Sequence, residues 1–109
     1  MNITTNPGDD STVVVLEGRF DAHEAPHAAA TFDSVLDDGQ SNIEVSLADV
    51  QFIDSTALAQ LVRVMKRCKE AGGKFSLLNP SDPVLVILEL TALDKAFTIV
   101  DGQSADQAA

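Results

Sequence analysis

Along most of this chain, short segments with the side-chain pattern of β-strands alternate with longer segments that have the pattern of helices. β-Branched and apolar residues predict strands at 12–16, 42–47, 74–78 and 97–100, and Ile3-Thr4 indicates one more before a turn at Pro7-Gly8. Apolar residues at helical spacing, with capping residues around them, predict helices over 26–36, between Asp54 and Gly72, and from Ser81 to Leu90. Such alternation favours a sheet covered by helices over a sandwich or a helix bundle. We therefore predict the α/β fold class, with a mixed β-sheet of four to five strands and covering helices.

No repeat, linker or change of composition divides the chain, so we expect residues 1–109 to form a single domain. We expect its ordered core to span about 12–100, and residues 102–109, which contain nothing larger than Gln, to form a flexible tail. The predicted strand at 12–16 is β-branched and apolar, so it should be buried on both faces and stop at Gly18. The next should stop at Leu47, where strict apolar-polar alternation ends.

The chain has 17 acidic and 7 basic side chains, which gives a formal net charge of −10 at pH 7. This charge repels phosphate backbones, and five Phe without Trp or Tyr offer few rings for base stacking, so we predict no nucleic-acid partner. Apolar runs are far shorter than the roughly 20 residues of a membrane span, which argues against membrane insertion. One cysteine, and an N-terminus without a basic region before an apolar stretch, predict a cytoplasmic protein.

Two features that could suggest catalysis are better explained as structure. His23-Glu24-Ala25-Pro26-His27 matches a zinc metalloprotease pattern, but Pro26 forces the residue before it out of the helical region. We therefore expect two solvated histidines at a helix start. Cys68 lies on the apolar stripe of the second helix and near its C-terminus, where the dipole disfavours a thiolate, so we expect a core residue. We predict no catalytic residue, no metal and no cofactor, and hence no enzyme activity.

The segment Asp54-Ser55-Thr56 has two interpretations. In the structural one, Asp54 or Ser55 is the N-cap of the second helix and Thr56 is a first-turn residue. In the functional one, a hydroxyl at the helix N-terminus carries a phosphate, because free N–H groups and the positive end of the helix dipole stabilise an anion there. Phosphate would add about −1.5 to −2 charges beside Asp54 and would expel an acidic or tightly fitted partner without unfolding the domain.

The run Val50-Gln51-Phe52-Ile53-Asp54-Ser55-Thr56-Ala57-Leu58, with its amphipathic helix into Gly72-Gly73, resembles the phosphorylation-site segment of bacterial anti-sigma factor antagonists. These proteins are single-domain members of the STAS superfamily. Leu16-Glu17-Gly18-Arg19-Phe20-Asp21 is similar to the family's Gly-x-hydrophobic-Asp segment, and Pro83 to Ile99 looks like its final helix and strand. The resemblance covers about residues 12–100 and implies a single STAS-type domain.

In this family, the unphosphorylated antagonist binds an anti-sigma factor that is itself an ATP-dependent serine kinase, and so frees the sigma factor. Phosphorylation of the serine after the aspartate releases the antagonist, and a phosphatase restores it. The resemblance therefore implies that Ser55 is the phosphorylation site, and that an anti-sigma factor with serine kinase activity and a phosphatase are the partners. It also implies partner-binding roles for Asp21, Asp54, Thr56 and Ala57.

The chain departs from the family pattern at Ala57 and at Ala92, where glycine is common. If the Ala57 methyl group faces the partner, it should crowd a surface that the family keeps small. Two other functions remain open within the same fold. One is a non-phosphorylated STAS accessory subunit of a phospholipid-transport ATPase, whose looser motif usually lacks the Asp-Ser pair. The other is an interaction module of a larger stress-sensing assembly.

Overall fold

The structure, a computed structural model, describes residues 1–100, which form one five-stranded sheet and three helices. The strands are β1 (Asn2–Pro7), β2 (Thr12–Phe20), β3 (Ile43–Ile53), β4 (Phe75–Leu78) and β5 (Thr98–Val100). The helices are α1 (Ala25–Asp37), α2 (Ser55–Glu70) and α3 (Asp82–Leu90). The predicted α/β class is confirmed, as is the mixed sheet of four to five strands with covering helices. The tail expected at 102–109 lies outside the described residues.

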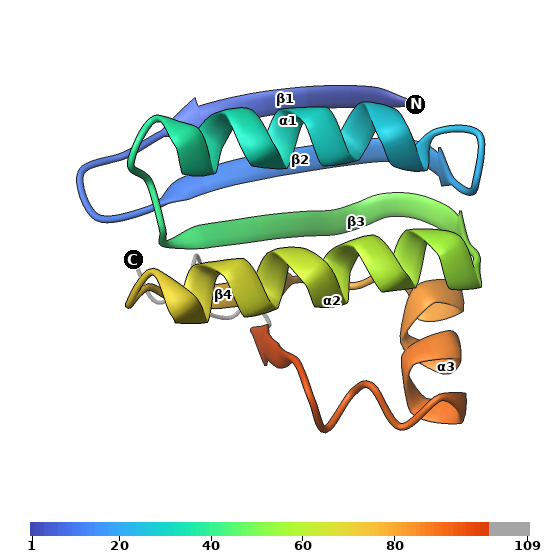
Figure 1. The fold of residues 1–109 in the computed structure, drawn as a ribbon. Helices are drawn as coiled ribbons and strands as arrows, with labels where there is room; N and C mark the ends of the chain where they lie inside the picture. The colour runs from blue at the N-terminus through green and yellow to red at the C-terminus, as the bar shows by residue number, and fades with distance from the viewer. Residues whose placement is uncertain (101–109) are drawn as a thin grey trace, which may run out of the picture.

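The sheet has the strand order β1-β2-β3-β4-β5. β1 is antiparallel to β2, with Ile3 opposite Leu16, which confirms the strand that Ile3-Thr4 indicated. The other neighbouring pairs are parallel. Figure 1 shows α1 and α2 side by side across the same face of the sheet, with α3 near the end of β3. Because β2 and β3 run in the same direction, the segments that follow them meet at one edge of the sheet.

The hydrophobic core lies between the sheet and the two helices α1 and α2. Inward-facing residues of the central strands are fully or almost fully buried, among them Val14, Leu16, Phe20, Ile43, Val45, Leu47, Phe75 and Leu77. They pack with the apolar faces of the helices. On β2, however, Val13 and Val15 are only half-buried. The expectation that this strand is buried on both faces is therefore wrong, because α1 and α2 cover the same side of it.

Two strands continue beyond the predicted ends. β2 passes through Gly18 to Phe20, because a glycine at φ +113° lets the strand absorb an irregularity in its pairing with β3. β3 continues past Leu47 to Ile53. Register shifts along β2 and β3 change the spacing of buried side chains from two to three, so that Leu47, Val50 and Ile53 face the core. Because of this change of period, strict alternation of apolar and polar residues does not predict the second half of β3.

The helices begin and end close to the predicted residues. α1 has Pro26 in its first turn and is followed by Gly39 at φ +92°. Ser81 is the N-cap of α3, and its hydroxyl group donates a hydrogen bond to the carbonyl of Val50, which joins the start of α3 to β3. Among residues 1–100, no helix has the length and apolar character needed to cross a membrane.

Candidate functional site

Asp54 connects the two segments that follow β2 and β3. Its Oδ1 accepts a hydrogen bond from the backbone N–H of Ala57 at 2.9 Å, so Asp54 is the N-cap of α2. Its Oδ2 accepts a hydrogen bond at 2.8 Å from the N–H of Ala22, in the loop between β2 and α1. The backbone N–H of Asp54 also donates to the carbonyl of Phe20 at 3.3 Å. The structural interpretation of Asp54 as a cap is therefore confirmed, and the cap also fixes the neighbouring loop.

Asp21 organises that loop from within. Its Oδ1 accepts hydrogen bonds from the backbone N–H groups of His23 and Glu24, both at 3.1 Å. Its Oδ2 lies 3.6 Å from the Nε of Arg19. Burial raises the pKa of the Asp21 carboxyl, but these hydrogen bonds and the positive charge of Arg19 outweigh it, so the pKa lies below its ordinary value. Asp21 is therefore a charged residue that shapes the loop held by Asp54.

Ser55 and Thr56 are the first two residues of α2, and both are exposed. Neither hydroxyl group forms a hydrogen bond with any part of the chain that the structure describes. The first turn of a helix carries free N–H groups and the positive end of the dipole, which favour an anion at this position. The structure thus presents two accessible hydroxyl groups directly after the Asp54 cap.

Ala57 differs from its two neighbours because it is fully buried, with 0% of its surface exposed. Its side chain belongs to the hydrophobic core that α2 forms with the sheet. The condition that its methyl group lies at the surface is therefore not met in the free domain, because the third residue of α2 already faces the sheet. A direct partner contact by the Ala57 side chain is therefore not supported in the free domain.

The histidine motif and the cysteine behave as structural residues. His23 and His27 are exposed on either side of Pro26, as expected, and His27 Nδ1 lies 3.5 Å from the carboxylate of Glu24. Among the described residues, no cluster of three or more His, Cys, Asp or Glu side chains could hold a metal ion. Cys68 is fully buried, which confirms its place in the core, and burial raises the pKa of its thiol.

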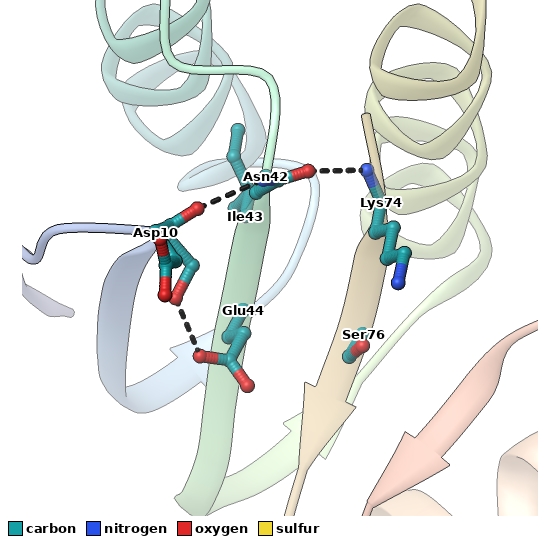
Figure 2. Close-up of a pocket in the computed structure, with 7 residues that line it drawn as sticks. Asp10, Asn42, Ile43, Glu44, Lys74 and Ser76 are labelled. Atoms are coloured by element: carbon teal, nitrogen blue, oxygen red, sulfur yellow. Dashed lines mark hydrogen bonds between the residues drawn. The ribbon is translucent and has the colours of Figure 1, made fainter. Parts of the chain in front are cut away.

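A polar hollow of about 250 Å³ lies at the opposite edge of the sheet, at the amino ends of β3 and β4 (Figure 2). Asn42 joins its walls: its side-chain amide donates to the carbonyl of Asp10 at 2.8 Å, and its oxygen accepts the N–H of Lys74 at 2.9 Å. Ser11 donates to Glu44 at 2.9 Å across the same hollow. These hydrogen bonds satisfy much of the polar lining and hold the loops together, and the hollow is remote from Ser55.

Sequence reasoning missed one contact next to the site. Arg19 and Phe52 are paired positions on β2 and β3, and the guanidinium carbon of Arg19 lies 4.0 Å from the centroid of the Phe52 ring. The sequence motifs that contain Arg19 and Phe52 indicate no role for either side chain. Because the register of β2 with β3 shifts twice before this pair, no simple spacing in the sequence could have brought the two residues together.

Proteins with related sequences have been named for one function. A Thermotoga maritima protein named as an anti-sigma factor antagonist is 39% identical over 70 residues, which are 64% of this chain and 62% of that protein. The chain thus matches less than two thirds of the length of that relative. The anti-sigma-B factor antagonist of Staphylococcus aureus is 26% identical over 106 residues, with 97% of this chain and 98% of that protein covered.

Solved structures agree with the fold. The crystal structure of a Thermotoga maritima protein described as an anti-sigma factor antagonist has a TM-score of 0.81 and 29% identity, and the match covers 96% of this chain and 92% of that one. The phosphorylated form of the Bacillus cell fate determinant SpoIIAA has a TM-score of 0.73 and 18% identity over 99% and 100% of the two chains, a likeness of fold alone. The model of the STAS domain matches residues 1–104, and together with the five-stranded sheet and its helices this shows that the chain belongs to the STAS domain family.

Proposed function

We propose that this chain is a cytoplasmic anti-sigma factor antagonist. In its unphosphorylated form it binds an anti-sigma factor with serine kinase activity, and so promotes transcription that depends on the sigma factor. Phosphorylation at Ser55 releases it, and a phosphatase restores the binding form. The names of the Thermotoga and Staphylococcus relatives support the antagonist function, and the phosphorylated form known for SpoIIAA supports a modified state.

The observation that carries the proposal is the exposed, unbonded hydroxyl group of Ser55 at the first position of α2. A kinase must reach the acceptor oxygen, and nothing among the described residues competes for it by a hydrogen bond. The fold tolerates the product because the helix N-terminus stabilises the added anion. Asp54 has both oxygens engaged by N–H groups, so the cap can persist after modification.

The switch follows from charge. A phosphate adds about −1.5 to −2 charges next to the carboxylate of Asp54 and near that of Asp21 in the adjoining loop. A partner that fits this surface while Ser55 is neutral must then remove water from the phosphate, which costs free energy. Its own negative charges would also be repelled by two carboxylates and the phosphate dianion. Binding is lost while the domain stays folded. Asp21, Asp54 and Thr56 take part as residues of this surface, and Ser55 is preferred to Thr56 as the acceptor because it directly follows the aspartate.

Affinity capture from native extract, with mass spectrometry of the bound proteins and of the Ser55 peptide, tests the proposal. We expect an anti-sigma factor with a kinase domain to be bound by the parent, and ATP to release it with phosphate on Ser55. The Ser55→Ala variant should remain bound after ATP is added, whereas Thr56→Ala should be released like the parent. Capture of an ATPase subunit with no modification of Ser55 would instead favour the accessory-subunit function.

A further inference from the structure

Arg19 on β2 and Phe52 on β3 form an exposed pair, and Phe52 lies three residues before Ser55. The guanidinium group stacks over the ring at 4.0 Å, and the ring belongs to one of three large apolar side chains exposed on the described surface. Phe52 is 38% exposed and the side chain of Arg19 is 66% exposed. A cation over an exposed ring stabilises a fold only weakly, so folding gains little from leaving this pair at the surface.

The guanidinium group of Arg19 is held in one orientation, but some of its hydrogen-bond donors have no partner among the described residues. Its Nε faces Asp21 at 3.6 Å and its plane is supported by Phe52, whereas its two terminal nitrogens form no hydrogen bond with residues 1–100. Arg63 and Arg67 differ, because each donates a hydrogen bond from Nη1 to Asp33, at 3.0 and 2.7 Å. Arg19 therefore presents a free fork of donors, held in one orientation from two sides.

The pair is also connected to the proposed switch. Arg19 contacts Asp21, which shapes the loop that follows β2, and the next residue of that loop, Ala22, is bonded to the N-cap Asp54. The pair lies at the ends of β2 and β3, and the end of β3 leads directly into the start of α2 that carries Ser55 (Figure 1).

We propose that Arg19 and Phe52 together are an anchor that recognises a carboxylate side chain, with an apolar side chain beside it, on the protein partner of Ser55. Charge complementarity supports this occupant, because a carboxylate matches two parallel guanidinium donors and the ring offers apolar area next to them. Arginine and aromatic side chains carry a large share of the affinity in protein interfaces. An anchor already oriented by Asp21 loses little freedom on binding. This inference rests on the proposed function, since it concerns the same partner.

Titration calorimetry with the purified anti-sigma factor from the capture experiment tests the anchor. Arg19→Ala and Phe52→Ala should each raise Kd by at least about tenfold, while the double variant should lose less than the product of both effects, because the residues share one contact. Arg19→Lys should recover only part of the affinity, since an ammonium lacks the fork. Two controls should change Kd less than about twofold. Lys66→Ala removes one exposed positive charge elsewhere, and Leu90→Ala shortens an exposed apolar side chain on α3. Thermal unfolding checks that every variant is folded.

The outcomes separate the two proposals. If the parent binds no anti-sigma factor, the proposed function fails and the anchor fails with it. If the parent binds and folded Arg19→Ala or Phe52→Ala binds equally well, the anchor alone is overturned. The anchor is also overturned if Arg19→Lys binds as tightly as the parent, or if the two controls lose as much affinity as the anchor variants. A third contrary outcome is that Arg19→Ala changes the Kd only when Ser55 is phosphorylated, because the guanidinium group would then interact with the phosphate.

Discussion

The carboxylate of Asp54 accepts the backbone N–H of Ala22 at 2.8 Å across 32 positions of sequence, while its other oxygen caps α2 through Ala57. One side chain thus holds the loop after β2 against the helix that carries Ser55. The exposed hydroxyl group is positioned on a helix start whose geometry is fixed from two directions. A modification at Ser55 therefore changes the charge of a surface that is already formed.

Asp54→Ala should lower the free energy of unfolding by about 1–2 kcal/mol, because the variant loses both the N-cap and the bond to Ala22. Urea denaturation measures the change. Asp54→Asn keeps one oxygen that can cap and should lose less, and Asp9→Ala, in an exposed turn, should lose nothing measurable. Equal stability of Asp54→Ala and the parent would show that the carboxylate is not a structural link.

The stabilisation contributed by Asp21 should disappear in acid. Its pKa in the folded domain lies below the ordinary value of 3.8, so the unfolded chain binds the proton more readily. The contribution is full above about pH 5, begins to fall near the unfolded value, and is lost as the pH falls through the folded pKa. The difference in unfolding free energy between the parent and Asp21→Asn should therefore be larger at pH 7 than at pH 2.5. A difference that stays constant over this range would contradict the lowered pKa.

The sequence predicted the elements of the fold better than their lengths. Helix starts carry local signals, such as Pro26 in α1 and the Asp54 cap of α2. Because capping acts over three or four residues, these signals predict the helix starts correctly. The extensions of β2 through Gly18 and of β3 to Ile53 depend on the register between two strands. Register is a property of a strand pair, so neither strand alone could reveal it.

The candidate site was predicted in part for the same reason. Asp54 and Ser55 are adjacent in sequence, so their relation to the helix start was visible. The bond from Ala22 to Asp54 and the stack of Arg19 on Phe52 join distant segments, and only the sheet brings them together. The burial of Ala57 follows from the rotation of α2 against the core, which the family pattern of small residues did not specify.

Ser55→Asp should weaken binding of the anti-sigma factor while leaving the domain folded. A carboxylate at the first helical position interacts favourably with the dipole, but it adds a negative charge beside Asp54 on the proposed contact surface. We expect the thermal midpoint to move little and Kd to rise, with Ser55→Asn as the neutral control that stays closer to the parent. If Ser55→Asp binds as tightly as the parent, charge at this position does not control binding.

Ala57→Gly separates stability from binding, since the buried methyl group belongs to the core and not to the partner surface. The variant should lose about 1–2 kcal/mol of unfolding free energy, from the lower helix propensity of glycine and from about 0.8 kcal/mol for the methyl group. Ala59→Gly is a matched control on the exposed side of α2, where the propensity effect acts alone, so it should lose less. Urea denaturation of both variants gives the difference. Affinity for the anti-sigma factor should stay within about twofold of the parent, because hot-spot losses come from side chains that touch the partner. An increase in affinity for Ala57→Gly, but not for Ala59→Gly, would show that the methyl group reaches the partner after all and that α2 shifts on binding.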